Sequence, residues 1–460
     1  MRRLQAILGN LRVLLASNAS YLPPRGGSTR SNLAFLETLA ERGRETRVVA
    51  AAAETHTEAQ RRRLENELAE QRLDPGLARR LEREPAVTGF FNGIEILSVR
   101  DFMRHTALLT QQVSEFRPDW LLVSSEDVSH TLIREAARSA PGRLVYLAHT
   151  PQFFPFGEAS WHPDREATEA IRRAAAVVVI SRAMAAYVER HLGREATLIH
   201  PPIYKEPVLD RSESATSSAL ASGAIAMINP CAVKGISLFL ALADSLPSEQ
   251  FAVLPGWGTS AENLAHLKAR RNITVWPRVR KIEEFLSTVK VLLVPSLWLE
   301  GFGLIVMEAM LCGVPVIASN SGGLPEAKAG TGFVIPVHLI ESYEPVFDDR
   351  NMPRPLLPPQ DIGPWLEALK TLMSSPDVYY VQRHAHREAA QNFVSRIQRF
   401  EFDQVLSGLS AAAPSHVSSS VSASAIPEIQ LPRMADRLSD DRRALLLKRL
   451  RSRYGAGSRS

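Results

Sequence analysis

The chain has little cysteine, with only Cys231 and Cys312 among its 460 residues. The two lie far apart in the sequence and show no metal-ligand spacing. We therefore expect neither a disulfide framework nor a zinc site, and this cysteine usage fits the cytosol.

Long apolar runs are also missing. No segment reaches about 18 consecutive apolar residues, so no transmembrane helix is expected. Residues 1–15 are similar to a secretory signal, but Asn10 and Arg12 interrupt the apolar stretch and the sequence continues as the first strand of a domain. We expect a cytoplasmic protein, with peripheral membrane attachment as the alternative.

The main body of the chain lacks a strong charge of either sign. The formal net charge is +5, but the segment from Arg433 to the end holds nine Lys/Arg and three Asp/Glu, which leaves the rest near −1. Electrostatics thus give no support for nucleic-acid binding by the main body. With 45% hydrophobic residues, the chain has material for two sizeable cores.

Short apolar runs, of the kind that a parallel sheet buries on both faces, recur in two series. The first series comprises 11–16, 46–52, 93–99, 120–124, 143–148 and 176–180, and the second comprises 224–228, 251–254, 273–276, 291–294 and 314–318. A Ser-rich stretch separates them, as expected of an interdomain linker. The predicted organisation is an amino-terminal Rossmann-like domain at 1–210, a nucleotide-sugar-binding domain at 211–378, a terminal crossover helix at 379–406, a flexible Ser/Ala/Pro linker at 407–434 and a basic amphipathic tail helix at 435–460.

The most informative segment is SLWLEGFGLIVMEAMLCGVPVIASNSGGLPE, which runs from Ser296 to Glu326. It reads as a glycine-bearing turn, a helix that begins near Gly303, a buried strand and a second glycine turn. Such turns direct free backbone N–H groups and the positive end of the helix dipole at one point above the sheet. That point suits a diphosphate.

Two carboxylates frame this point, Glu300 before the helix and Glu308 on it. A carboxylate would repel a phosphate, so beside an anion site we expect both to accept hydrogen bonds from hydroxyl groups of a sugar or ribose. The alternative is that both only favour a helix start. The surrounding glycines favour a ligand site.

With these residues in place, the chain resembles the retaining glycosyltransferases of family 4, which are of the two-domain GT-B type. The signature is Glu300 and Glu308, with seven residues between them, in the context EGFGLIVMEAMLCGVPVIAS, followed by GGLPE. The resemblance implies an α/β fold of two doubly wound Rossmann-like domains facing a cleft, here with a carboxy-terminal linker and helix. It also implies transfer of a hexose-type sugar from a nucleoside-diphosphate sugar to an acceptor hydroxyl, without metal or cofactor.

The resemblance assigns three catalytic residues by position. Glu300 corresponds to the glutamate that contacts the donor sugar, and Lys234 in NPCAVKG corresponds to the lysine that pairs with the diphosphate. His149, at the end of the strand LVYLAH, corresponds to a histidine near the transferred sugar, although a structural role is the alternative. The implied donor-binding residues are Gly26, Gly27, Asn229, Gly301, Phe302, Gly303 and Glu308, the last one on the ribose.

One position departs from the family pattern. Many relatives carry an arginine five residues before the lysine, where this chain has Asn229. Either Arg278, Arg280 or Lys281 supplies the missing charge, or the diphosphate is held more loosely.

Glu126 and Asp127 follow the strand LLVSS and are the candidate acceptor contacts, with simple solvation of a loop as the alternative. No carboxylate pair resembles the flanking acid and nucleophile of a glycoside hydrolase. Two further alternatives stay open for the whole protein. One is a non-catalytic GT-B scaffold, and the other is a hydrolase or epimerase acting on nucleotide sugars.

The tail segment 438–450, LSDDRRALLLKRL, resembles a short helical motif in linkers of nonribosomal peptide and polyketide assembly lines. A tether to such a synthase would raise the local concentration of a natural-product acceptor. The alternatives are a basic amphipathic helix on an anionic membrane, as in lipid or polysaccharide biosynthesis, and an end with no partner.

Overall fold

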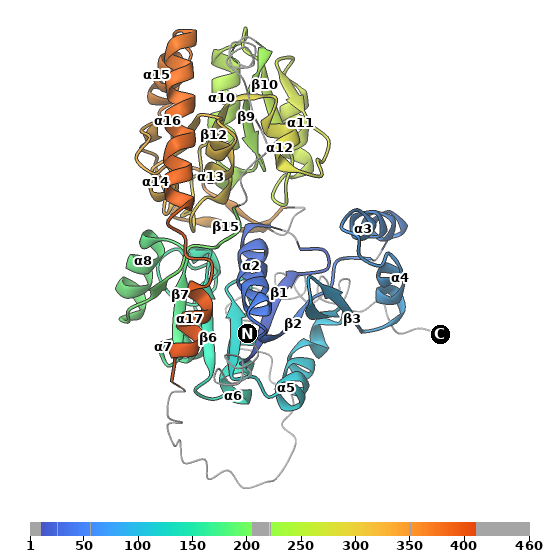
Figure 1. Cartoon of the computed structure of the whole chain (residues 1–460). Coiled ribbons are helices and arrows are strands. Elements are labelled where there is room, and N and C mark those ends of the chain that lie inside the picture. The colour runs from blue at the N-terminus through green and yellow to red at the C-terminus, as the bar shows by residue number, and fades with distance from the viewer. Residues whose placement is uncertain are drawn as a thin grey trace. The chain divides into compact units, whose positions relative to one another are not determined.

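The computed structural model describes residues 11–24, 26–55, 57–204, 220, 222–348 and 352–410. These residues form two open α/β sheets, each covered by helices on both faces (Figure 1). The predicted fold class of two Rossmann-like domains is confirmed. The boundary predicted at 210/211 falls within 205–219, and most of the linker and all of the tail helix (438–450 included) fall within 411–460, so these predictions lie outside the described residues.

The first sheet has the strand order β3-β4-β2-β1-β5-β6-β7-β8, and its strands are parallel except for the antiparallel β3–β4 pair. Every residue of the central strands β5 and β6 is buried, as their unbroken apolar runs predict. The strands are β1 (Arg12–Ser20), β2 (Glu45–Ala51), β3 (Ala86–Phe91), β4 (Ile94–Val99), β5 (Trp120–Ser124), β6 (Leu144–Ala148), β7 (Ala176–Val179) and β8 (Thr197–Leu198).

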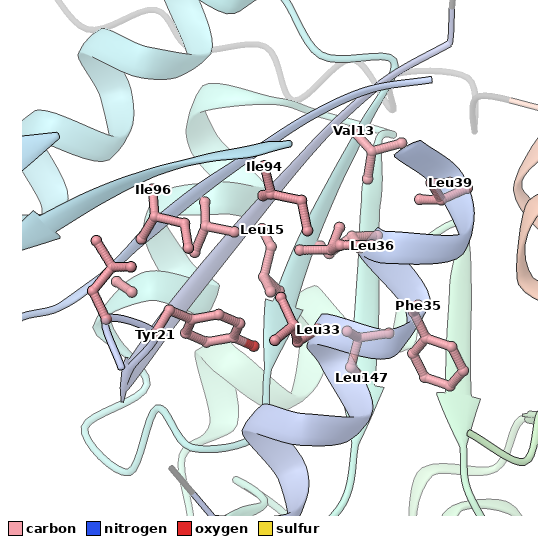
Figure 2. Packing of buried hydrophobic residues seen from close by; sticks show 14 of the residues in the cluster. Val13, Leu15, Tyr21, Leu33, Phe35, Leu36, Leu39, Ile94, Ile96 and Leu147 are labelled. Atoms are coloured by element: carbon pink, nitrogen blue, oxygen red, sulfur yellow. The ribbon is translucent and has the colours of Figure 1, made fainter. Parts of the chain in front are cut away.

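Helices cover both faces of this sheet. One face carries α2 (Gly27–Glu41), α3 (Glu58–Glu70) and α4 (Gly76–Arg83), and the other carries α5 (His105–Phe116), α6 (Thr131–Ser139), α7 (Arg165–Arg172) and α8 (Arg182–Leu192). Short 3-10 turns lie at η1 (Phe102–Arg104) and η2 (Pro151–Phe153). Figure 2 shows Leu33, Leu36 and Leu39 of α2 packed against Val13 and Leu15 of β1.

The second sheet is parallel, with the order β11-β10-β9-β12-β13-β14. Its strands are β9 (Ala224–Ile228), β10 (Phe251–Leu254), β11 (Ile273–Val275), β12 (Val289–Val294), β13 (Val316–Ser319) and β14 (Val334–Ile335). Its helical elements are η3 (Ala232–Lys234), α10 (Ile236–Ser245), α11 (Ala261–Lys268), α12 (Ile282–Leu286), α13 (Leu304–Leu311), α14 (Leu324–Ala327), α15 (Gly363–Leu372) and α16 (Pro376–Val394). A separate hairpin joins β15 (Tyr343–Phe347) to β16 (Pro353–Pro355).

The single helix predicted at 379–406 is wrong, because the structure has two helices, α16 and α17 (Glu401–Gly408). They serve different domains: α16 lies beside α13 of the second domain, whereas α17 contacts α2 of the first (Figure 1). The Phe402 ring stacks on Phe35 with centroids 4.6 Å apart, and Asp403 pairs with Arg44 at 2.8 Å. The chain breaks its helix to change domains, and α17 extends to Gly408, past the predicted linker start at 407.

A buried lysine in the second domain makes folding sensitive to pH. Lys328 is fully buried, donates a hydrogen bond to the carbonyl of Val316 and lies 2.8 Å from Nε2 of His386 on α16. Burial lowers the pKa of Lys328 from 10.5 to about 7.

Between pH 7 and pH 10.5, the pKa values of Lys328 in the folded and unfolded chain, the unfolded chain binds more protons than the folded one. The free energy of unfolding therefore rises with pH in this range. We expect the free energy of unfolding to gain up to about 1.4 kcal/mol per pH unit from this group. In Lys328→Met this increment should disappear. Urea titrations of both proteins at pH 7, 8 and 9 measure it, and parallel pH profiles would contradict the prediction.

Among the described residues, no helix combines the length and the apolarity needed to cross a bilayer.

Candidate functional site

The candidate site lies where strands of both sheets end. The turn after β1 supplies Gly26 and Gly27, the end of β6 supplies His149, and the end of β9 leads to Asn229. The turn between β12 and α13 supplies residues 295–303. Ligands bind at the carboxyl ends of strands in open α/β sheets, so the fold gathers these residues at the expected edge.

The turn before α13 touches the first domain very closely. Gly303 adopts φ 97° at the start of α13, a conformation that favours glycine. A Cβ atom on Gly301 would lie 2.1 Å from the carbonyl oxygen of His149, and Ser181 Oγ donates to the Gly301 carbonyl at 2.6 Å. Only glycine permits this approach, which brings two predicted site residues from different domains together.

The first turns of two helices also meet here. Gly26 precedes α2 with φ 84°, and a Cβ atom on Gly27 would lie 3.3 Å from the side chain of Leu304, the first residue of α13. A Cβ atom on Gly26 would meet nothing within 4 Å. Since helix amino termini carry partial positive charge, two such ends beside open space favour an anionic ligand.

Lys234 and Glu300 form an ion pair at the centre of the site. Lys234 Nζ donates to Glu300 Oε1 at 2.6 Å, Ser296 Oγ donates to the same oxygen, and Lys234 Nζ lies 4.6 Å from the ring centroid of Trp298. Burial raises the pKa of Glu300, but the charge and hydrogen bond of Lys234, together with hydrogen bonds from Ser296 and Trp298, lower it by more, so the net shift is downward. The carboxylate is therefore ionised at neutral pH and can accept hydrogen bonds from hydroxyl groups.

Glu308 also lies in this region, but it carries an unexpected partner. Its Oε1 accepts a hydrogen bond from Arg30 of α2, so an ion pair joins the two domains next to the glycine turn. Burial lowers the pKa of the Arg30 guanidinium, but the charge and the hydrogen bond of Glu308, with smaller effects of Tyr204 and Glu283, together raise it by more, so the net shift is upward. Arg30 thus places a permanent positive charge beside Gly26 and Gly27.

Asn229 has a clear structural role. It adopts φ 56°, is 7% exposed, and its Oδ1 accepts a hydrogen bond from the backbone N–H of Gly258 at 2.8 Å. Asparagine tolerates this left-handed conformation better than arginine does. The residue therefore secures the turn after β10.

None of the three residues predicted to replace the missing arginine contacts a predicted site residue through an ion pair in the described structure. Arg278 pairs with Glu67 of α3, and Arg280 and Lys281 are exposed. Arg30, which the sequence analysis missed, is the arginine that pairs with Glu308 next to the glycine turn. Its signal was its place one helical turn after Gly26 and Gly27.

His149 is held by a buried hydrogen-bond chain. Its Nε2 lies 2.6 Å from Asn32 Oδ1, Asn32 Nδ2 donates to Ser124 Oγ at 2.7 Å, and Ser124 Oγ donates to Glu126. Burial lowers the pKa of His149 to about 3, so the imidazole is neutral. Nδ1 has no hydrogen-bond partner among the described residues. Since Nε2 faces an amide oxygen, it carries the proton of the neutral ring, and Nδ1 can accept a hydrogen bond from a ligand hydroxyl. The neutral imidazole cannot supply a positive charge.

The two candidate acceptor residues differ. Burial raises the pKa of Glu126 to about 7 against the lowering effect of a Ser28 hydrogen bond, and Glu126 Oε1 has no partner in the described structure. Asp127 is fully buried, and its Oδ2 accepts from the N–H groups of Leu132 at 2.8 Å and Ile133 at 3.1 Å. Asp127 therefore caps α6, which excludes loop solvation, and Glu126 is the better ligand candidate.

The side chain of Phe302 belongs to the core. It is 2% exposed and packs near His200 and Phe393, with ring centroids 5.5 and 5.6 Å away. Only its backbone can contribute to a ligand site, as the resemblance implied. Among the described residues, no group of three or more His, Cys, Asp or Glu is arranged to hold a metal ion. The predictions of no metal and no cofactor stay predictions.

Comparison with known proteins agrees with this geometry. Residues 25–206 match the family described as Glycosyltransferase Family 4, and residues 222–344 match the family described as Glycosyl transferases group 1. The structure of Anabaena Alr3699/HepE in complex with UDP and glucose superposes with a TM-score of 0.58 at 15% identity, over 86% of this chain and 98% of that one. At this identity the likeness establishes the fold.

Curated relatives match over short stretches. D-inositol 3-phosphate glycosyltransferase of Mycobacteroides abscessus is 39% identical over 70 residues, which are 15% of this chain and 16% of the relative. O-antigen chain mannosyltransferase B of Escherichia coli is 43% identical over 58 residues, 11% of this chain and 15% of the relative. The matches thus span about a sixth of the length of these relatives.

The paired sheets have the fold of the GT-B glycosyltransferases, and the two matched stretches are similar to two glycosyltransferase families. The longer of these stretches, residues 25–206, is similar to Glycosyltransferase Family 4 and makes up less than half of the chain.

Proposed function

We propose that this protein transfers a hexose-type sugar from a nucleoside-diphosphate sugar to an acceptor hydroxyl with retention of anomeric configuration. The observation that supports it best is the Lys234–Glu300 pair beside the facing first turns of α2 and α13. An ammonium group and two helix ends suit a diphosphate, and an ionised carboxylate suits sugar hydroxyls. The glycosyltransferase class is consistent with this pairing.

In the proposed reaction, the bond between the sugar C1 and the diphosphate oxygen breaks while the acceptor oxygen bonds to C1 on the same face. The acceptor proton passes to the departing phosphate oxygen. Negative charge develops on the diphosphate, where Lys234 and the helix ends stabilise it. Glu300 would hold the sugar, Glu308 the ribose, and neutral His149 a sugar hydroxyl, so the protein mainly positions both substrates.

The first experiment is a thermal-shift screen of nucleoside diphosphates and their sugars, followed by product analysis with the donor that binds. Stabilisation by a nucleoside diphosphate and an α-linked product from an α-linked donor would support the proposal. Free sugar alone would indicate a hydrolase, an altered free sugar nucleotide would indicate an epimerase, and an inverted product would overturn the retaining mechanism. No stabilisation by any nucleotide would favour the non-catalytic scaffold.

We expect the guanidinium of Arg30 to contact the diphosphate of the donor, and a substitution can test this contact. We expect Arg30→Gln to raise the donor Kd and KM about tenfold, because a charge-assisted contact to phosphate contributes on the order of 1.5–3 kcal/mol. Calorimetric titration with the donor measures this change. Arg79→Gln is the matched control, since Arg79 pairs with Glu65 on α3, outside the site.

If Arg30 only joins the domains through Glu308, then Glu308→Gln should weaken the nucleoside diphosphate as much as Arg30→Gln does. If Arg30 binds the phosphates, inorganic diphosphate should lose affinity in Arg30→Gln and keep it in Glu308→Gln. Equal losses of affinity for inorganic diphosphate in both variants would contradict the proposed contact between Arg30 and the phosphates.

The acceptor class is open between two groups of molecules. The names of the curated relatives point to a cyclitol phosphate or a polysaccharide precursor. The tail motif at 438–450 points to a natural product on a synthase, with an anionic membrane as the alternative partner. The scaffold alternative is weakened by Asn229, whose fixed structural role explains the departure that favoured it.

A further inference from the structure

A cavity of about 770 Å³ opens beside the donor site. One wall comes from Gln152 and residues 158–162 of the first domain, and the other comes from residues 339–344, Phe347 and Pro353 of the second. Leu299 also lines it and directly precedes Glu300 in the chain. The cavity therefore adjoins the carboxylate proposed to hold the transferred sugar, which is where an acceptor must wait.

Three aromatic residues line the cavity, Trp161, Tyr343 and Phe347. Trp161 meets Tyr343 with ring centroids 5.5 Å apart and meets Trp298 at 6.3 Å. Trp298 in turn carries Lys234 over its ring. A series of rings thus runs from the cavity to Lys234, the cation proposed to pair with the diphosphate. Such flat apolar surfaces suit an acceptor with a ring face.

The polar groups of the wall include hydrogen-bond acceptors, besides the donors of Ser160, Trp161, Ser342 and Tyr343 and the imidazole of His162. Gln152 is 3% exposed, and its Oε1 has no partner among the described residues. Glu158, Glu341 and Glu344 also line the cavity, whereas no lysine or arginine is among its described lining residues. Two of these acids have a basic neighbour outside the lining: Glu158 lies 3.9 Å from His191, and Glu344 lies 3.9 Å from Arg354.

We propose that this cavity is the acceptor subsite, and that it takes a phosphate-free ring compound whose hydroxyl or amino groups donate to the wall. Three carboxylates attract ammonium groups and repel phosphate, and the aromatic rings add attraction for a cation. The inference rests on the proposed function, because it names the acceptor class for the same reaction. The proposal predicts that the cavity binds neutral or amine-bearing acceptors more tightly than phosphorylated ones.

The test uses three aryl glycosides that differ at one position: 4-nitrophenyl glucoside, its 6-amino-6-deoxy derivative and its 6-phosphate. Their Kd values are measured by tryptophan fluorescence in the presence of the nucleoside diphosphate found in the screen. We expect the 6-phosphate to bind at least tenfold more weakly than the glucoside, and the 6-amino compound to bind at least as tightly. Preference for the 6-phosphate, or no binding of any of the three, would overturn the proposal.

Variants assign the preference to this wall. In the double variant Glu341→Gln and Glu344→Gln, the discrimination against the 6-phosphate should fall about tenfold, while the nucleotide Kd stays the same. Trp161→Ala should weaken all three compounds, and Trp161→Phe should restore part of the affinity. Glu166→Gln, on the exposed side of α7, is the matched control for loss of a negative charge.

Failure of this inference can be told apart from failure of the proposed function. If no nucleoside diphosphate binds the wild-type protein, the proposed function itself fails. If the nucleotide binds and the charge variants leave acceptor discrimination unchanged, only the assignment of the cavity fails.

Discussion

Replacement of Glu300 by alanine is expected to reduce sugar transfer about 10²–10³-fold, the effect typical of losing one preorganised group at a reacting centre. Glu300 is 9% exposed and is kept ionised by Lys234, so it is ready to accept hydrogen bonds from the donor sugar. Initial rates at saturating donor and acceptor measure the loss.

The control for this variant must separate catalysis from folding. Removal of Glu300 leaves Lys234 without its ion-pair partner, which costs stability in a buried setting. We expect the far-ultraviolet circular dichroism to be retained, and Glu284→Ala on the exposed face of α12 should keep full activity. Undiminished turnover in folded Glu300→Ala would count decisively against the site.

Replacement of Lys234 by alanine is expected to have a similar effect, about 10²–10³-fold on the turnover number, because Lys234 is the cation proposed to stabilise the charge that develops on the leaving diphosphate. It should also change the pH profile. Without the lysine, burial dominates and the pKa of Glu300 rises, so the acid limb of the residual activity should move to higher pH.

The measurement is the turnover number of wild type and Lys234→Ala between pH 4.5 and pH 8. Lys268→Ala, which removes an exposed lysine from the last turn of α11, is the matched control. An unchanged turnover number would contradict the role of Lys234 in stabilising the leaving group. A reduced rate with an unshifted acid limb would show that Lys234 does not set the ionisation of Glu300.

The predictable part of the fold is the part in which local sequence and burial agree. The apolar runs at 120–124 and 224–228 match β5 and β9 residue for residue, because strands in the middle of a parallel sheet bury both faces. The edge strand β3 was missed because its sequence, AVTGFF, includes a glycine and an exposed phenylalanine. The β15–β16 hairpin was missed because it consists largely of exposed residues and prolines.

The candidate site was predicted where backbone geometry decides and missed where long-range contacts decide. The glycines at 301 and 303 mark their turns directly in the sequence. The pairing of Arg30 with Glu308 joins residues 278 positions apart, which no local pattern can show. The capping role of Asp127 was likewise hidden, since it depends on how the backbone after β5 folds back onto α6.

The last helix, α17, has a consequence for biosynthesis. Phe402, Asp403 and Leu406 complete a surface of the amino-terminal sheet, yet the ribosome makes them after the whole second sheet. Covering that surface buries two large apolar side chains, on the order of 1.5–3 kcal/mol each. This surface of the first domain therefore stays partly uncovered until α17 has been synthesised. A nascent chain stalled before residue 400 should expose it to chaperones that the finished protein no longer meets.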